Sequence, residues 1–286
     1  GTDEQKARML PPLIKGAEKA CFGVTEPDAG LNTTRLKTKA VRQGARYVAS
    51  GTKVWISTAQ VAEKILLLAR TTPLEQCAKP TQGLSLFYTS LDRRAVEIRE
   101  IEKMGRKAVD SNQLFIDRLE IPADDLIGDE GRGFEYILHG MNPERILIAA
   151  EAVGLGRAAL ERGSLYAKER IVFDRPIGQN QAIQHPLAEC WVALEAAELL
   201  VNRAAWKYDT GQPCGADANA AKRVAAQAGF KACERSVLTH GGFGYAKEYH
   251  VERFFRESML PRIAPVSREL ILSFIAERVL GLPKSY

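Results

Sequence analysis

The chain has 286 residues, of which 45% are hydrophobic and 26% charged, and its formal net charge is +5. This length allows one large domain or two ordinary domains with a sizeable core. The small net charge does not call for nucleic acid, no apolar run approaches the ~18 residues of a membrane span, and no signal-peptide pattern is present. Five scattered cysteines, at positions 21, 77, 190, 214 and 233, favour free thiols in a reducing compartment over disulfides or a metal site.

Residues 1–20 have the pattern of a helix end that Pro11-Pro12 stops, and we expect them to finish a helical domain that precedes this chain. Residues 21–128 predict a β domain, because short segments rich in Ile, Val, Leu, Phe and Tyr alternate with glycine and Pro-Asp turns. Their spacing favours a small antiparallel barrel or sandwich. The strand segments are 37–55 (with a turn near 43–45), 64–71, 83–90, 95–101 and 113–122.

Helical composition begins after the sequence Gly128-Asp129-Glu130-Gly131, where alanine, leucine, glutamate and arginine become dominant. Residues 129–286 therefore predict an antiparallel bundle resembling a four-helix bundle, with long helices joined by short connections. The candidates after the first helix are 181–210, 217–239 and 267–280. The whole chain is expected to be of the α+β class, with a β domain followed by a helical domain.

Two segments of the β domain, here called the wall segments, are suited to hold a flat ring. The segment 24–30 places the Thr25 hydroxyl before a Pro/Gly-rich turn, and the segment 53–57 places the Trp55 indole beside the Ser57 hydroxyl. An indole offers a large apolar face with little side-chain entropy to lose, and hydroxyls can bond ring heteroatoms. The pair predicts a wall for a polar-edged aromatic ring such as a flavin. The alternative is that Trp55 is an ordinary core aromatic.

Three further motifs follow in order. Arg170-Ile171-Val172-Phe173 is followed by Gln181, a glycine pair lies in the segment 240–245, and Val251-Glu252-Arg253-Phe254-Phe255-Arg256 precedes a C-terminal loop. Together with the wall segments, these motifs resemble the acyl-CoA dehydrogenase family in order and approximate spacing across nearly the whole chain. In that family a helical N-terminal domain precedes the β domain, and we expect it to be absent from this chain.

The resemblance implies FAD as the cofactor. Thr25 and Ser57 would hydrogen-bond the isoalloxazine with Trp55 packed beside it, and Arg170 would pair with the pyrophosphate, a contact that can cross a subunit boundary. Arginine matches phosphate with a bidentate fork, and glycine permits close backbone approach. The cofactor-binding residues implied in this way are Phe22, Val24, Thr25, Trp55, Ile56, Ser57, Arg170, Phe173, Gln181, Leu238, Gly241, Gly242 and Ser267.

Some of these positions have simpler explanations or depart from the family pattern. The alternative for Arg170 is an ordinary helix-surface arginine paired with Glu169 or Asp174, and the glycine pair is able to cap a helix, alone or while also facing the cofactor. Leu31 and Asn32 stand where the family usually has Ser-Asp. Asp174 replaces the glycine after Phe173, and Leu238 replaces a common glutamine.

The resemblance also calls for a carboxylate that removes the α-proton of an acyl-CoA thioester. Many members carry it in a C-terminal Tyr-Glu-Gly-Thr loop, but this chain reads Ala264-Pro265-Val266-Ser267 there, and proline cannot accept a proton. Isovaleryl-CoA and long-chain members carry the base early in the helical domain, before an arginine. The segment 142–145 matches that place, which implies Glu144 as the catalytic base. The substrate-binding residues implied are Leu31, Asn142, Arg145 and Val266, with Val266 or Ser267 as backbone donor to the thioester carbonyl.

A structural alternative exists for Glu144. Asn142-Pro143 is a strong helix-start pair, which would place Glu144 in the first turn, where the helix dipole lowers its pKa.

The implied reaction is α,β-dehydrogenation of a saturated acyl-CoA to the trans-2-enoyl-CoA in fatty acid β-oxidation, with electrons passed to an electron-transferring flavoprotein. An acyl-CoA oxidase that uses O₂ and a non-catalytic flavin- or acyl-CoA-binding paralogue stay open, the latter because of Pro265. The resemblance further implies a homodimer or homotetramer, located in a bacterial cytoplasm or a mitochondrial matrix.

Overall fold

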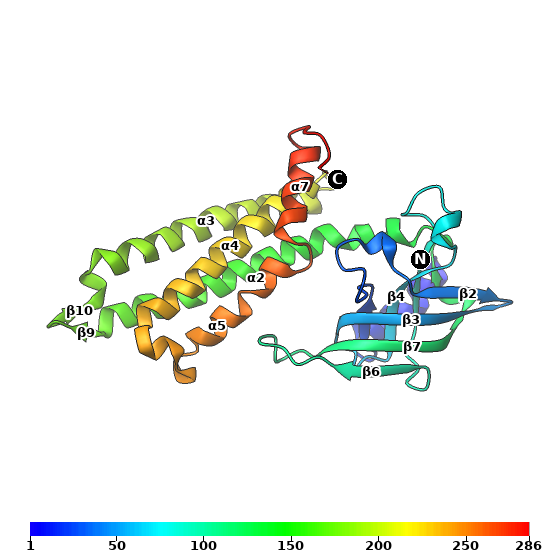
Figure 1. The fold of residues 1–286 in the computed structure, drawn as a ribbon, viewed down its shortest axis with the longest axis horizontal. Helices are drawn as coiled ribbons and strands as arrows, with labels where there is room; N and C mark the ends of the chain where they lie inside the picture. The colour runs from blue at the N-terminus through cyan, green and yellow to red at the C-terminus, as the bar shows by residue number, and fades with distance from the viewer. Residues whose placement is uncertain (286) are drawn as a thin grey trace. The chain divides into compact units, whose positions relative to one another are not determined.

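A computed structural model describes residues 1–285, in two units that have separate cores, Gly1–His139 and Gly140–Tyr286 (Figure 1). The first unit is built on an antiparallel-rich sheet and the second is helical, which confirms the α+β class. Composition changes after residue 128, but the first unit extends to His139 because Phe134, Tyr136 and Ile137 pack into its core. No helix within residues 1–285 has the length and apolar content needed to cross a membrane.

The sheet of the first unit has the strand order β6-β7-β3-β2-β4-β5-β8, and β1 joins it beside β4. β1 and β2 pair with β4 in parallel, and the other pairs are antiparallel. The sheet has two edge strands, β6 and β8, so the described strands form no closed barrel. The predicted barrel is therefore not seen. The strands are β1 Ala20–Gly23, β2 Lys39–Gln43, β3 Arg46–Ser57, β4 Lys64–Arg70, β5 Leu84–Ser90, β6 Val96–Glu100, β7 Ser111–Pro122 and β8 Leu126–Ile127.

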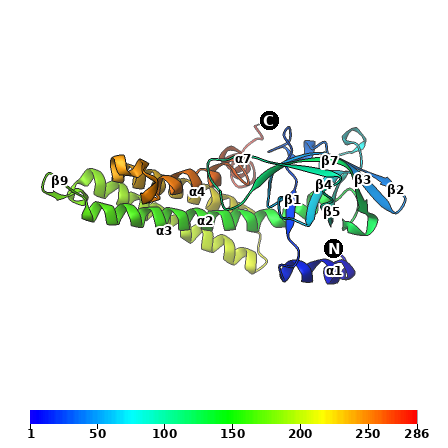
Figure 2. The ribbon, with the colours of Figure 1, turned by 90° about the horizontal axis from the view of Figure 1, so that it is seen from below.

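The central strand β4 is buried on both of its faces. Ile65 and Leu67 belong to one hydrophobic cluster and Leu68 to another, as the continuous apolar run of β4 predicts for a strand covered on both sides. The helix α1 (Asp3–Ile14) lies beside the sheet, where the Gln5 side chain donates to the carbonyl oxygens of Asp124 and Leu126 (Figure 2).

Pro11 and Pro12 do not stop α1, contrary to expectation, and the helix continues to Ile14. A proline cannot donate a backbone hydrogen bond, but its carbonyl still accepts one. The Pro11 carbonyl accepts from Lys15 N at 3.1 Å, so the last turn forms.

The second unit is a bundle of long helices joined by short connections (Figure 1). The predicted ranges of α3, α4 and α7 agree with the structure to within two residues at each end. The helices are α2 Gly133–Glu169, α3 Gln181–Asp209, α4 Gly215–His240, α5 Val251–Glu257, α6 Leu260–Ile263 and α7 Arg268–Arg278, with a hairpin of β9 Ile171–Val172 and β10 Arg175–Pro176. Short 3₁₀ helices are η1 Thr33–Arg35, η2 Leu74–Gln76, η3 Ala123–Asp125, η4 Ile177–Gln179, η5 Gly241–Tyr245 and η6 Lys247–Tyr249.

Small residues let α2 and α4 approach closely. A Cβ added to Gly229 on α4 would lie 2.4 Å from the carbonyl oxygen of Ala152 on α2, so only glycine fits there. On the α3 side, Arg157 of α2 forms ion pairs of 2.6 Å with both Glu195 and Glu198. The bundle core therefore fixes α2, the helix that carries the predicted base.

Candidate active site

The two wall segments, 24–30 and 53–57, are neighbours in the first unit. The backbone N–H of Val54 donates to the carbonyl oxygen of Thr25 at 2.9 Å, and the Lys53 ammonium donates to the carbonyl oxygen of Val24 at 2.9 Å. The structure thus brings Thr25 next to the strand that carries Trp55.

A buried ion pair holds these segments together. The Lys53 ammonium is fully buried and donates to Val24 O, Leu68 O (2.8 Å) and the Glu26 carboxylate (2.9 Å), which occupies its three N–H groups. Glu26 also accepts from the backbone N–H groups of Lys37 at 2.6 Å and Thr38 at 2.9 Å. Burial alone would raise the pKa of Glu26, but the Lys53 charge and the N–H donors outweigh it and lower that pKa. The carboxylate therefore stays ionised.

Trp55 is not a core aromatic. Its side chain is 58% exposed, and its backbone has a φ of 62° at a point where β3 and β7 shift register. The left-handed conformation costs about 1–2 kcal/mol for a residue with a Cβ, and strained residues cluster at binding sites. Neither the Thr25 nor the Ser57 hydroxyl donates to or accepts from another described side chain or backbone group, so both are available to a ligand.

The other predicted residues in and beside the wall segments differ in how deeply they are buried. The Phe22 side chain is 43% exposed and can line a ligand. Val24 and Ile56 point into hydrophobic clusters, so only their backbone can face a ligand. Leu31 is exposed beyond the Pro/Gly-rich turn.

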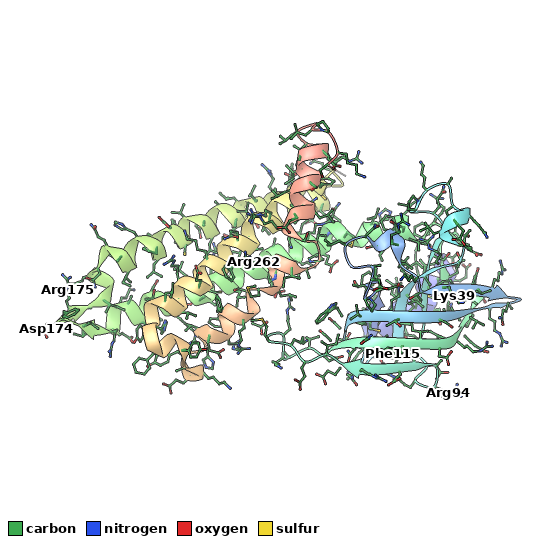
Figure 3. The ribbon with its side chains drawn as sticks, in the orientation of Figure 1. Lys39, Arg94, Phe115, Asp174, Arg175 and Arg262 are labelled. Carbon is green, nitrogen blue, oxygen red and sulfur yellow. The ribbon has the colours of Figure 1, made fainter. Side chains whose placement is uncertain are left out.

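The second group of predicted cofactor residues lies at the hairpin end of the second unit. The β9–β10 hairpin turns at Phe173 and Asp174, which have φ values of 52° and 62°, the positive values that tight two-residue hairpins require. Phe173 is 92% exposed, and Figure 3 shows Asp174 and Arg175 at the tip of this unit. Gln181 is exposed as the first residue of α3.

Arg170 lies beside the glycine pair. Its guanidinium carbon is 6.0 Å from the Phe243 ring centroid, and within residues 1–285 it forms no ion pair with Glu169 or Asp174, so that alternative is wrong. Gly241 ends α4 with a φ of 58°, so the capping role is real. A Cβ added at Gly241 or Gly242 would meet no atom within 4 Å, so the backbone there faces open space. Leu238 is exposed in the last turn of α4.

Glu144 does not start a helix. The helix α2 begins at Gly133 and passes through Pro143, which contradicts the helix-start alternative. Away from the first turn, the helix dipole no longer lowers the pKa of Glu144. The side chain keeps contact with solvent, yet partial desolvation by surrounding protein atoms raises the pKa of its carboxylate, and the Arg145 charge opposes the shift only in part.

Lys222 of α4 links the Glu144 segment to the C-terminal loop. Its buried ammonium donates to the carbonyl oxygen of Val266 at 2.5 Å, and burial, followed by the nearby Arg145 charge, lowers the pKa of Lys222 to about 8. Arg145 itself donates to the Asn142 side chain at 3.1 Å. Asn142, Arg145 and Val266 are thus near one another.

The loop 264–267 keeps backbone donors available. The Ser267 hydroxyl caps α7 by accepting from Leu270 N at 3.3 Å. The backbone N–H groups of Val266 and Ser267 have no acceptor in the described part of the chain.

Comparisons with known proteins decide the family. Residues 21–119 match the family described as acyl-CoA dehydrogenase, middle domain, and residues 131–280 match acyl-CoA dehydrogenase, C-terminal domain. The chain belongs to the acyl-CoA dehydrogenase family. It is an oxidoreductase, and its cofactor is FAD.

Named relatives agree with this membership. The acyl-CoA dehydrogenase FadE12 of Mycobacterium tuberculosis is 40% identical over 100% of this chain and 74% of that protein. The structure of butyryl-CoA dehydrogenase from Megasphaera elsdenii matches with a TM-score of 0.93 and 31% identity, covering 98% of this chain and 73% of that one. A structure described as the electron transferring flavoprotein of Acidaminococcus fermentans matches with a TM-score of 0.93 and 30% identity, with the same coverage.

The residues of this acyl-CoA dehydrogenase fit FAD chemically. The first unit offers an exposed indole and two free hydroxyls, which suit a flat ring with polar edges. The second unit offers an arginine without a carboxylate partner beside a glycine pair that faces open space, which suits a pyrophosphate.

Sequence reasoning missed the residues that position these groups. Lys53, Glu26 and Lys222 were not singled out. A usable signal existed for Lys222, because a lysine stands on the face of α4 where Ala218, Ala221 and Ala225 are buried.

Proposed function

We propose that the protein catalyses flavin-dependent α,β-dehydrogenation of a saturated acyl-CoA to the trans-2-enoyl-CoA, with Glu144 as the base that removes the α-proton. One observation carries the assignment of the base. The loop 264–267 contains no carboxylate, whereas α2 carries Glu144 with a raised pKa, next to Arg145, whose charge acts on that loop's anchor, Lys222. FAD, when bound, accepts the hydride from the β-carbon.

A carboxylate that acts as a base needs a raised pKa, and the pKa of Glu144 is raised. A carboxylate near its ordinary pKa of ~4.3 is a weak acceptor for a carbon acid. Desolvation already raises the pKa of Glu144, and burial by a bound acyl chain raises it further. The charge of the adjacent Arg145 limits the rise in the pKa of Glu144.

Lys222 orients the donor for the thioester carbonyl. It holds the Val266 carbonyl oxygen at 2.5 Å, and in a trans peptide unit the following N–H points the opposite way. The N–H of Ser267 therefore points away from Lys222. We infer that this N–H stabilises the negative charge that develops on the carbonyl oxygen.

Glu144→Gln tests the assignment. In the FAD-loaded protein mixed with acyl-CoA, we expect the loss of visible flavin absorbance to slow by about 10²–10⁴-fold, because general-base assistance is removed. Glu161→Gln changes another exposed glutamate of α2 and should keep the wild-type rate. Bleaching of Glu144→Gln at the wild-type rate would exclude Glu144 as the base.

Two rival functions have their own outcomes. If the wild-type protein is bleached by no acyl-CoA, the protein is a binding paralogue. If the reduced flavin reoxidises rapidly in air in stopped-flow experiments, the protein is an acyl-CoA oxidase.

The partners follow from the same proposal. We propose an electron-transferring flavoprotein as the acceptor, supported by the Acidaminococcus fermentans neighbour. We also propose a homodimer or homotetramer, because Trp191, Leu199 and Trp206 are exposed along one face of α3, and such patches mark interfaces. A monomer in sedimentation equilibrium would contradict the second proposal.

A further inference from the structure

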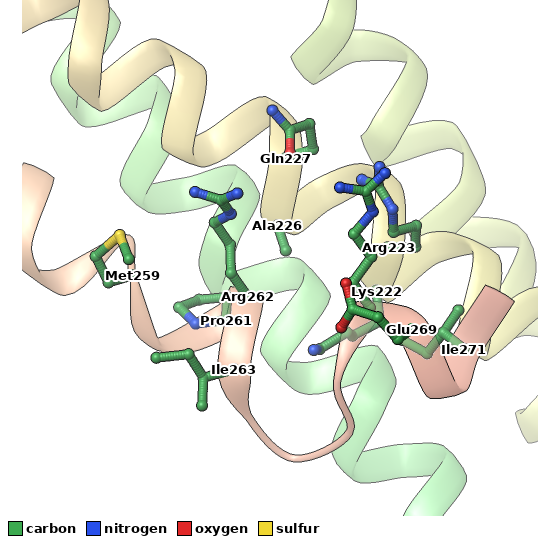
Figure 4. Close-up of a pocket in the computed structure, with 11 residues that line it drawn as sticks. Lys222, Arg223, Ala226, Gln227, Met259, Pro261, Arg262, Ile263, Glu269 and Ile271 are labelled. Atoms are coloured by element: carbon green, nitrogen blue, oxygen red, sulfur yellow. The ribbon is translucent and has the colours of Figure 1, made fainter.

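In each unit, a buried side chain holds a backbone carbonyl next to a predicted site residue. In the second unit, Lys222 holds the carbonyl oxygen of Val266, in the pocket between α4, α6 and α7 (Figure 4). In the first unit, the fully buried Asn112 of β7 donates from Nδ2 to the carbonyl oxygen of Ile56 on β3 at 2.9 Å. Ile56 directly precedes Ser57, so Asn112 acts on the backbone that carries a predicted FAD-binding residue.

Three partners fix the orientation of the Asn112 amide. Its oxygen accepts from Nε2 of Gln60 at 2.8 Å, and its nitrogen donates to the Asp110 carboxylate as well as to Ile56. The same carboxylate accepts from the backbone N–H of Gln60 at 3.1 Å. Burial opposes ionisation of Asp110, but the hydrogen bonds from Asn112 and Gln60 prevail and lower its pKa. A flipped amide would place its oxygen against two acceptors, so the side chain has one favourable orientation.

This contact lies where the pairing of β3 with β7 is interrupted. The two strands shift register between Lys53 and Ile56, and Trp55, which lies in between, has a φ of 62°. Such irregularities re-aim side chains beside binding sites, and a strained residue persists only where its surroundings hold it firmly. Pairing resumes with Ile56 opposite Asn112, and the buried amide adds a second link at that point. The amide therefore secures the end of β3 that carries Trp55 and Ser57.

The direction of the Ser57 N–H follows from the same contact. The peptide bond between Ile56 and Ser57 is trans, so its N–H points opposite to its carbonyl. Because Asn112 holds that carbonyl, the Ser57 N–H points away from Asn112.

We propose that Asn112 is a positioning residue for FAD, which acts through the peptide between Ile56 and Ser57 and keeps the Ser57 N–H available to a polar edge of the ring. Gln60 and Asp110 hold the amide in the orientation that this requires. A hydrogen bond to the ring strengthens as the ring takes up electrons, so a well-positioned donor makes the flavin easier to reduce. The inference rests on FAD as the cofactor and is independent of the choice of Glu144 as the base.

Asn112→Leu in the FAD-loaded protein tests the proposal. Leucine has a similar size but donates no hydrogen bond to Ile56. We expect FAD to bind about tenfold more weakly, the usual effect of losing one buried hydrogen bond, and the reduction potential of the flavin to fall. Fluorescence of the FAD released on dilution gives the dissociation constant, and reduction in the presence of a reference dye gives the potential.

Asn219→Leu is the matched control. Asn219 of α4 is also buried, and its Nδ2 donates to a backbone carbonyl oxygen, that of Gly215, also at 2.9 Å. The change removes an equivalent hydrogen bond in the second unit, so the affinity for FAD and the reduction potential should keep their wild-type values. Melting temperatures verify that the variants are folded.

Gln60→Leu keeps the proposal testable if Asn112→Leu does not fold. Gln60 is exposed, so the change leaves the core intact, but it removes the donor that holds the Asn112 oxygen. We expect about threefold weaker FAD binding and a lower reduction potential.

Three results would overturn the proposal. They are wild-type affinity and potential in Asn112→Leu, equal changes in Asn219→Leu, and an unfolded Asn112→Leu together with an unaltered Gln60→Leu. None of these measurements uses acyl-CoA, so wild-type bleaching of Glu144→Gln would reject the proposed base and retain this inference.

Discussion

Lys53 and Trp55 stand two residues apart on β3, yet one is buried and the other exposed. In a regular strand, residues i and i+2 share a face. The register shift between Lys53 and Ile56, together with the positive φ of Trp55, breaks this alternation. The ammonium can therefore reach Glu26 inside while the indole faces outwards, so the binding surface depends on a local departure from strand geometry.

Lys53→Met tests how strongly this pair supports the first unit. Removing the ammonium leaves Glu26 buried without its counter-ion, and we expect a loss of about 3–5 kcal/mol in the free energy of unfolding. Urea denaturation followed by circular dichroism measures it.

The control for this prediction is Lys37→Met. It removes an exposed ion pair with Asp28 but keeps the backbone N–H that donates to Glu26, so we expect a far smaller loss than for Lys53→Met. Equal losses in the two variants would contradict the role given to the buried pair.

At the scale of elements, two glycines of α2, Gly154 and Gly156, differ in the space around them. Only Gly156 lies at the contact with α4. A Cβ on Gly156 would lie 2.7 Å from Leu194 Cδ2 and 2.9 Å from Gly229 Cα. A Cβ on Gly154, half a turn away on α2, would meet nothing within 4 Å. The first glycine is required by packing and the second is not.

We therefore expect Gly156→Ala and Gly154→Ala to have opposite effects. Gly156→Ala should lower stability by about 1–3 kcal/mol, because α2 and α4 must separate. Gly154→Ala should raise it by about 0.5–1 kcal/mol through helix propensity. Thermal unfolding followed by the helical circular dichroism signal compares them, and a higher melting temperature for both would refute the close contact.

For the whole molecule, each of the two units contains a buried carboxylate that is paired with a cation and has a lowered pKa. In the first unit Glu26 pairs with Lys53 at 2.9 Å. In the second unit Asp217 pairs with Lys207 at 2.7 Å and with Arg203 at 2.8 Å. Burial opposes ionisation at both sites, but the cations and hydrogen bonds prevail and lower the pKa of Glu26 and of Asp217.

The sign of the pH dependence follows from these shifts. A carboxylate with a lowered pKa in the folded state stabilises the fold above its ordinary pKa, and this stability is lost as the pH falls through the folded value. We expect melting temperatures to fall below about pH 4. Glu26→Gln and Asp217→Asn should reduce stability at neutral pH and flatten this fall. A parallel fall in wild type and variants would show that other groups control acid unfolding.

The sequence by itself indicated the family, the α+β class and the limits of α3, α4 and α7, because these depend on local patterns. Apolar periodicity marked α3 and α4, and short motifs marked Thr25, Trp55, Arg170 and the glycine pair. Glu144 was found because the C-terminal loop lacks a carboxylate; its role remains a prediction.

Only the tertiary structure decided how these residues are held. Two contacts join residues that are distant in sequence: Lys53 with Glu26, and Lys222 with Val266. Local sequence patterns do not reveal such pairs. The same holds for the contact of Asn112 with Ile56, which requires β3 and β7 to pair in the observed register. The position of Glu144 well inside α2 also needed the structure, because Asn142-Pro143 is a helix-start pattern, and packing of the helix on both sides outweighs a single proline.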